Sequence, residues 1–198
     1  MFMTTTSSAR IVGLGTALVL VGTAGFATIP GLIAEDALGN KTINAFYCSV
    51  MTLTTVGYGD ICPGTITSHW AKAFLVLLSF VSLGFFCGPV MDLAATWKNA
   101  VPGGPLVLAL TTIGLGVAIF TQPMFADGKV GLSLTDAAYY STITGTTIGY
   151  GDFTPSTDAG KIMAAIYSIM SVNVIGGLLE PAAGFLGRLV TVKKNKVP

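Results

Sequence analysis

Two segments with the same order of residues carry the clearest chemistry in this chain. Residues 54–60 read TTVGYGD and residues 146–152 read TTIGYGD, and we call them the first and second signature segments. Each contains two glycines, which lack the Cβ atom that hinders left-handed backbone dihedrals. A segment with such dihedrals can turn its carbonyl oxygens toward one side, where a row of oxygens replaces the hydration shell of a cation. The pattern therefore predicts cation binding by the peptide backbone.

The signature segments predict a set of residues along a cation path. We expect backbone strain to be greatest at the glycines, and the aliphatic and tyrosine side chains to point away from the path. The threonine hydroxyls can add ligands at the inner end, while Asp60 and Asp152 place carboxylates at the outer end. The predicted cation-binding residues are Thr55, Val56, Gly57, Tyr58, Gly59, Thr147, Ile148, Gly149, Tyr150 and Gly151.

The composition is that of a membrane protein. Of the 198 residues, 52% are hydrophobic and only 10% are charged, whereas soluble domains carry about 25% charged residues. The net charge of +1 gives no indication of nucleic-acid binding. The sequence shows no Ser-His-Asp set, nucleotide-binding loop or pair of catalytic carboxylates, so it does not support an enzymatic function.

Four apolar stretches are long enough to cross a bilayer, which takes about 20 residues. They are residues 11–33, 70–97, 105–122 and 161–190. The shorter segments 43–54 and 135–146 lead directly into the signature segments, and they predict re-entrant pore helices that protein and water surround. Asn44 and Asp136 are the expected capping or first-turn residues of these helices. The predicted fold class is an all-α membrane protein with four transmembrane helices and two re-entrant pore helices.

The first apolar stretch has a second interpretation. Residues 7–27 resemble a signal peptide, with one arginine, an apolar run and then small residues. The run continues to Ile33, beyond the usual signal core, and its removal would strip the first half of its outer helix. We expect a retained transmembrane helix, with the signal peptide as the alternative.

The chain predicts an internal repeat of two similar halves, residues 1–98 and 99–198. The two signature segments are 92 positions apart, and AFYCS at residues 45–49 matches AAYYS at residues 137–141 with the same offset. Each half contains an even number of transmembrane helices, so both signature segments face the same side of the membrane. A carbonyl cage with four strands around one axis then requires two chains.

These segments resemble the selectivity filters of the tandem-pore-domain potassium channel family. The sequences AFYCSVMTLTTVGYGD and DAAYYSTITGTTIGYGD carry the resemblance, and their residues are most similar to those of plant and algal members. It implies K⁺ in the filter with no other cofactor, a homodimer of this chain, membrane lipids as surroundings, and a background or leak K⁺ conductance. The alternatives are a modulatory or non-conducting channel subunit and a K⁺ transporter subunit. The expected location is the plasma membrane, with a vacuolar or plastid membrane as the alternative.

Residues outside the filter carry weaker expectations. Ser82 and Ser171 match hinge positions of similar channels, although close helix packing explains small residues equally well. Asn173 is expected near the cavity, where it contacts hydrated ions or forms an interhelical hydrogen bond. Glu180 is expected near the inner mouth, where it gathers K⁺ or pairs with Arg188.

The surroundings of the filter differ from those of some bacterial relatives, which place a glutamate behind it to bind the outer aspartate. The corresponding residues here are Met51 and Ile143, so Asp60 and Asp152 are expected to lack that partner. The signature side is also expected to be anionic, with seven acids against four lysines, Lys41, Lys72, Lys129 and Lys161. The remaining basic residues predict cytoplasmic termini.

Overall fold

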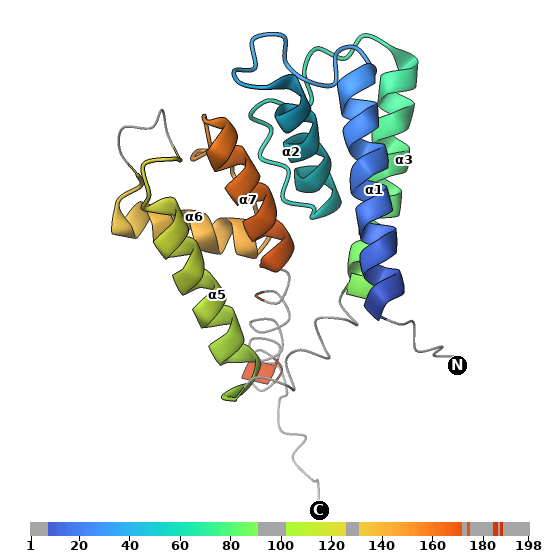
Figure 1. The fold of residues 1–198 in the computed structure, drawn as a ribbon. Coiled ribbons are helices and arrows are strands. Elements are labelled where there is room, and N and C mark those ends of the chain that lie inside the picture. Colours follow the sequence, from blue (N-terminus) through green and yellow to red (C-terminus); the bar gives the residue numbers. More distant parts are fainter. Residues whose placement is uncertain are drawn as a thin grey trace, which may run out of the picture.

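A computed structural model describes residues 8–90, 102–125 and 131–171, together with Val174, Gly184, Phe185 and Gly187. These ranges contain six α-helices and one π-helical turn, and no strand lies within them (Figure 1). The predicted all-helical class is therefore confirmed for the described part of the chain.

The first half contains three helices in the predicted order. Helix α1 spans Ser8–Thr28, α2 spans Lys41–Leu53, and α3 spans His69–Phe85 and continues into the π-helical turn η1, Phe86–Val90. By length and composition, α1 and the continuous helix His69–Val90 are the two described helices that could cross a membrane. The last part of the predicted second span, from residue 91, lies outside the described residues.

The second half repeats this order. Helix α5 spans Gly104–Phe120, α6 spans Leu134–Gly145 and α7 spans Asp158–Met170. Helix α5 is apolar but has only 17 residues. The described part of α7 covers the start of the predicted fourth span, and most of the remainder, up to residue 190, lies outside the described residues.

The helix N-termini show how the sequence begins each element, and they correct one prediction. Asn40, not Asn44, caps α2, since its side-chain oxygen accepts hydrogen bonds from two backbone amides at 2.8 and 3.4 Å. Asn44 lies inside the helix and is buried. In α6, Ser133 is the N-cap and Asp136 is the first-turn acid, with a Ser133 hydroxyl to Asp136 carboxylate distance of 2.7 Å. A carboxylate in the first turn is stabilised by the positive end of the helix dipole.

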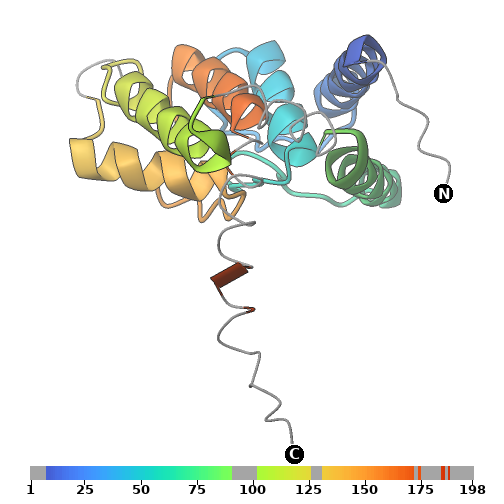
Figure 2. The ribbon, with the colours of Figure 1, turned by 90° about the horizontal axis from the view of Figure 1, so that it is seen from below.

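Helix α2 lies between α1 and α7, while α5 and α6 lie at the opposite end of the molecule from α1 and α3 (Figure 2). Close packing joins α1 to α2: a Cβ atom on Gly22 would lie 2.2 Å from the Ser49 hydroxyl oxygen. That hydroxyl donates to the carbonyl of Val19 at 3.0 Å. Helix α1 is thus an integral part of this packing, and its assignment as a retained transmembrane helix stays a prediction.

Aromatic rings hold the second half together. Phe120 of α5 makes edge-to-face contacts with Tyr140 of α6 and Tyr167 of α7, with ring centroids 4.6 and 5.2 Å apart. Phe125 also meets Tyr140, at 4.8 Å. These four rings are buried, and edge-to-face pairs add about 0.5–1.5 kcal/mol each to the burial of their surface.

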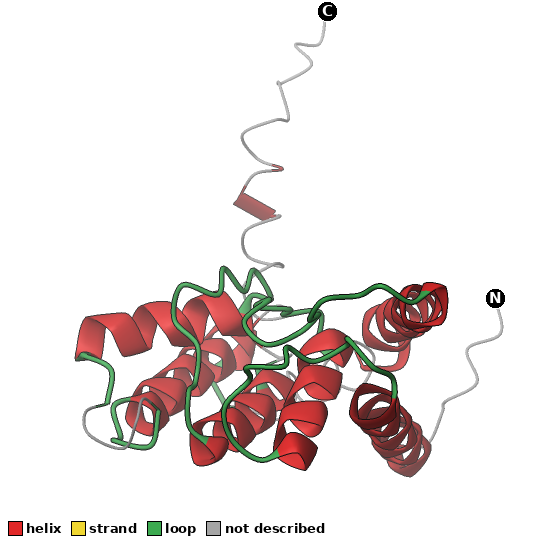
Figure 3. Ribbon diagram, turned by 90° about the horizontal axis from the view of Figure 1, so that it is seen from above, coloured by secondary structure: helices red, strands yellow, loops and turns green. Residues whose placement is uncertain are grey.

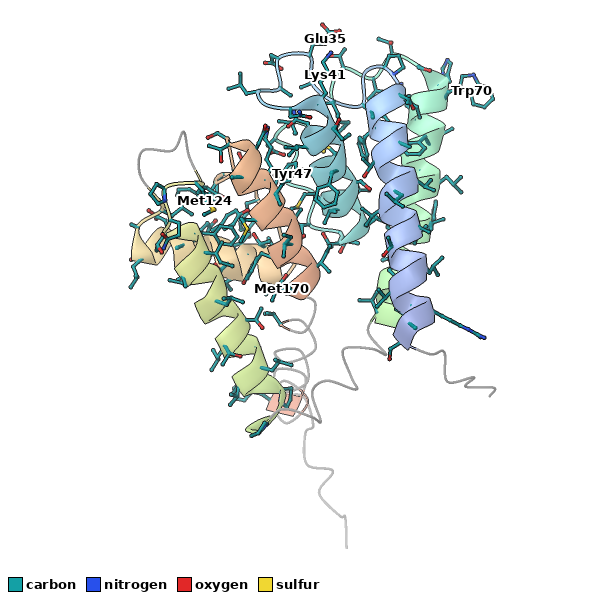
Figure 4. All side chains as sticks on the ribbon, viewed as in Figure 1. Glu35, Lys41, Tyr47, Trp70, Met124 and Met170 are labelled. Atoms are coloured by element: carbon teal, nitrogen blue, oxygen red, sulfur yellow. The ribbon has the colours of Figure 1, made fainter. Side chains whose placement is uncertain are left out.

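The outward faces of the longer helices are apolar. Trp70 is 83% exposed and points away from the helices, whereas Tyr47 lies among them (Figure 4). Seen from above, the connecting loops lie over the helices (Figure 3). Exposed large hydrophobic residues on α1, α3 and α5 include Val12, Leu14, Leu20, Val21, Val76, Leu77, Phe80, Leu83, Leu106, Val107, Leu110 and Leu115.

Candidate functional site

Both signature segments leave the C-terminal end of a short helix by the same turn. Helix α2 ends at Leu53 with Thr54 as its C-cap, and the carbonyl of Met51 accepts hydrogen bonds from the backbone amides of Val56 and Gly57, both at 3.1 Å. In the second segment, the carbonyl of Ile143 accepts the same two bonds at 3.0 and 3.2 Å. The repeat seen in the sequence is therefore also a repeat of local backbone structure.

Left-handed residues alternate with ordinary ones along each segment. In the first segment φ is +60° at Thr55, +54° at Gly57 and +74° at Gly59, and in the second it is +57°, +54° and +75° at the equivalent positions. This alternation compensates the usual reversal of successive peptide groups, so their carbonyls can share one direction. The expected unusual conformation of the glycines is observed.

The two threonines were missed as strained residues. Thr55 and Thr147 are the described non-glycine residues with positive φ, a conformation that costs an L-residue roughly 1–2 kcal/mol. A β-branched residue in this region is a genuine outlier. The sequence offers one indication of this conformation: each threonine stands two residues before the first glycine of its segment, so it continues the alternating pattern that the glycines begin.

The two segments lie side by side. A Cβ atom built on Gly149 would lie 2.1 Å from the carbonyl oxygen of Val56, and one on Gly151 would lie 2.3 Å from that of Tyr58. In contrast, nothing in the described chain lies within 4 Å of a Cβ on Gly57 or Gly59. The fold thus places the second signature segment against the carbonyl groups of the first. The side of the first signature segment toward which a Cβ atom on Gly57 or Gly59 would point stays open within the described chain.

The side chains of the first segment are buried against the second half of the chain. Tyr58 is 8% exposed, stacks on Tyr140 with ring centroids 5.7 Å apart, and shares a short hydrogen bond with the Thr144 hydroxyl. Val56 is 3% exposed. Helix α6 therefore supports the first segment from the side.

The matching side chains of the second segment have no such cover within the described chain. Ile148 is 50% exposed and Tyr150 is 67% exposed. Their equivalents in the first segment are almost completely buried, so one chain completes the packing around only one of its two signature segments.

The outer carboxylate of the first segment has a partner that the sequence analysis did not anticipate. The Tyr47 hydroxyl of α2 donates to Asp60 at 2.9 Å, so a tyrosine contacts Asp60 in place of the glutamate that the sequence lacks. Tyr139 stands at the same spacing before Asp152. The sequence feature that could have indicated the Tyr47–Asp60 bond is the tyrosine that stands 13 positions before each of the two aspartates.

Replacing Tyr47 with phenylalanine should lower the free energy of unfolding by about 1.5–3 kcal/mol, the range for a hydrogen bond to a charged group. Asp60→Asn should weaken the same bond. Since both changes remove the same interaction, the double variant should lose less unfolding free energy than the sum of the losses in the two single variants. Thermal unfolding in detergent measures this, and strictly additive losses would contradict the pairing.

The residues expected near the cavity are only partly described. Ser82 and Ser171 are buried, and their hydroxyls donate to carbonyls of their own helices, Leu78 at 2.6 Å and Ser168 at 3.0 Å. These contacts agree with close packing, and a hinge at either serine stays a prediction. Asn173 and Glu180 lie outside the described residues.

A polar cluster between the two halves was missed altogether. Lys161 of α7 is 2% exposed, and its ammonium donates to the Leu38 carbonyl at 2.6 Å and to the Asn44 side-chain oxygen at 2.7 Å. Nearby, the Asp158 carboxylate accepts from the Asn40 backbone amide at 3.0 and 3.1 Å. We call Leu38, Asn40, Asn44, Asp158 and Lys161 the inter-repeat cluster. Lys161, which the sequence analysis only counted among the lysines of the signature side, fastens α7 to α2.

Comparison with known proteins identifies the architecture. The family model described as "Ion channel" matches residues 13–98 and again residues 106–188, one match in each half. The chain is similar to two-pore potassium channel 4 of Arabidopsis thaliana, with 28% identity over 70% of this chain and 57% of the relative. It is also similar to two pore potassium channel a of Oryza sativa subsp. japonica, with 26% identity over 96% of this chain and 60% of the relative.

A mammalian relative shows the same relation. Potassium channel, subfamily K, member 16 of Mus musculus is 27% identical over 68% of this chain and 51% of the relative. The chain thus spans between 51% and 60% of the length of these three curated relatives. With one family match in each half, the chain belongs to the ion channel family, and it is similar to the two-pore potassium channels of plants and to a potassium channel of the mouse.

Proposed function

We propose that two copies of this chain form one K⁺-selective pore with a background conductance. The observation that carries the proposal is the pair of adjacent signature segments in which residues of positive φ alternate with ordinary residues. Such a backbone can present successive carbonyls to a dehydrated K⁺ ion, which crosses by repulsion between ions at neighbouring sites. Thr55 to Gly59 and Thr147 to Gly151 form the K⁺ sites, and Asp60 and Asp152 flank the outer mouth.

The dimer follows from what one chain leaves incomplete. A cage around one axis needs four strands, and one chain supplies two. A second chain related by a two-fold axis supplies the other two, and its first half covers Ile148 and Tyr150 as α6 covers Val56 and Tyr58. The exposure of 67% at Tyr150 against 8% at Tyr58 supports this arrangement.

The protein belongs to a family of channels and is an integral membrane protein, and the family is not a class of enzymes. We assign α1, α3, α5 and α7 to four transmembrane helices, whose exposed apolar side chains face lipid. Helices α2 and α6, with 13 and 12 residues, are too short to cross the bilayer. They enter it as pore helices, and their negative C-terminal ends favour a cation in the central cavity.

The two halves, residues 1–98 and 99–198, act as parallel repeats within a single membrane domain. Each contributes one outer helix, one pore helix, one filter strand and one inner helix to the pore. This division requires both signature segments to face the same side, and we assign the plasma membrane as the location.

A flux assay tests the conductance. Vesicles loaded with K⁺ and containing the purified protein should release K⁺ when a protonophore provides charge balance, whereas Na⁺-loaded vesicles should release little Na⁺. A non-conducting subunit would give no release above that of empty vesicles. Release that saturates at carrier-like rates would instead favour a transporter subunit.

Removal of K⁺ should also destabilise the protein. An ion that binds only the folded state adds RT ln(1 + [K⁺]/Kd) to its stability, about 2.7 kcal/mol at a concentration 100 times Kd. The unfolding temperature in detergent should therefore rise with K⁺ at constant ionic strength, with Na⁺ as the balancing cation. An unfolding temperature that depends only on total salt would count against the assigned sites.

A further inference from the structure

The contact between Lys161 and Asn44 provides a template for a contact that one chain cannot make. Lys161 is the fourth residue of α7, and its backbone amide donates to Thr157 at 2.9 Å. Its ammonium reaches Asn44 near the start of the pore helix of the other half, at 2.7 Å. The template is therefore a lysine in the first turn of an inner helix, bound to the first turn of the neighbouring pore helix.

The first half holds the same lysine at the same place. Lys72 is the fourth residue of α3, and its backbone amide donates to Ser68 at 3.3 Å. Unlike Lys161, it is exposed. Lys72 thus has the same position in its helix as Lys161, which is buried against α2, the pore helix of the other half.

The acceptor also has a counterpart, and it is charged. The residue 92 positions after Asn44 is Asp136, in the first turn of α6. Its carboxylate is half-buried and accepts from the Ser133 hydroxyl at 2.7 Å. Within one chain, α3, which carries Lys72, and α6, which carries Asp136, lie at opposite ends of the molecule (Figure 2).

We propose that Lys72 of each protomer forms an ion pair with Asp136 of the partner across the dimer interface. The inference rests on the proposed dimer: its four similar halves surround the axis with approximate four-fold symmetry, so Lys72 lies against the partner's Asp136 as Lys161 lies against Asn44 within one chain. A two-fold interface is isologous, so the pair occurs twice. Because the acceptor between chains is a carboxylate rather than an amide, the contact is electrostatic as well as hydrogen-bonded.

The charges also give the interface its specificity. A pairing that placed Lys72 near the partner's Asn44, or two first halves together, would leave Asp136 without a cation. Complementary charges fix register and disfavour wrong partners more than they add raw affinity. The ion pair thus selects the arrangement in which first and second halves alternate around the axis.

Charge reversal tests the pair. The variants Lys72→Glu and Asp136→Lys, alone and combined, are compared with wild type by single-molecule subunit counting in vesicles over a range of protein-to-lipid ratios. Each single variant turns two attractions into two repulsions and should raise the dimer dissociation constant about tenfold or more. The double variant restores opposite charges and should recover most of the loss.

A matched control separates the pair from general charge effects. Lys41→Glu changes an exposed lysine in the first turn of α2. It should leave the dissociation constant within about threefold of wild type. Equal effects of the control and the test variants, or a double variant no better than either single one, would overturn the ion pair.

The outcomes distinguish the two proposals. A wild-type chain that is monomeric at every dilution would contradict the dimer itself. A dimeric, K⁺-conducting wild type whose association is unchanged by Lys72→Glu would contradict the ion pair and leave the proposed pore standing.

Discussion

Replacing Gly149 with alanine should abolish K⁺-selective current. Gly149 has a φ of +54°, and a Cβ atom there would lie 2.1 Å from the carbonyl oxygen of Val56. The left-handed conformation alone costs alanine roughly 1–2 kcal/mol. The collision is with the backbone of the neighbouring strand, so neither strand can keep its carbonyls in place. We expect current below about a tenth of wild type, measured per molecule in planar bilayers.

A matched control separates this collision from the loss of a glycine in general. Gly114 of α5 has no positive φ, and a Cβ atom added to it would have no neighbouring element of the described chain within 4 Å. Gly114→Ala should retain wild-type current, since alanine favours a helix by about 1 kcal/mol over glycine. A Gly149→Ala protein with wild-type selectivity would mean that the two strands do not adopt this arrangement in the conducting state.

Replacing Lys161 with methionine should cause a large loss of stability. The substitution keeps a long unbranched side chain but removes both hydrogen bonds of the ammonium, to Leu38 and Asn44. These acceptors stay in place without their donor. Hydrogen bonds to charged groups contribute about 1.5–3 kcal/mol each, partly offset because the charge no longer has to be desolvated. We expect a net loss of about 2–4 kcal/mol.

Equilibrium unfolding in mixed micelles measures this loss, and Lys41→Met is its control. Lys41 is exposed in the first turn of α2, and substitutions at such positions usually change stability by less than about 0.5 kcal/mol. If both variants unfold at the same denaturant concentration, Lys161 does not hold the two halves together.

The helices and their order could be predicted from the sequence because hydrophobic length and the signature segments leave few alternatives. Residues 43–54 and 135–146 were expected as short helices, and the structure has them at Lys41–Leu53 and Leu134–Gly145. The caps were harder, because several polar residues precede each helix. Asn40 and Ser133 are the caps since they lie directly before the first helical residue.

The contacts between the two halves could not be predicted, because they depend on how α7 meets α2. A lysine near the end of an apolar stretch usually lies in water or at the membrane interface, and nothing local marks Lys161 as buried. The Tyr47–Asp60 bond likewise joins a helix to a strand through a turn whose geometry the sequence does not specify. The strain at Thr55 and Thr147 is visible only in the backbone.

The proposed pore depends most directly on K⁺ selectivity, and the reversal potential of the purified protein measures it. In a planar bilayer with K⁺ on one side and an equal concentration of Na⁺ on the other, the reversal potential should lie far from zero, with the sign that opposes the flow of K⁺ down its gradient. It should move by about 59 mV for each tenfold change in K⁺ concentration when K⁺ is the only permeant cation. A reversal potential near zero under these bi-ionic conditions, or one that follows Na⁺, would contradict the proposed filter.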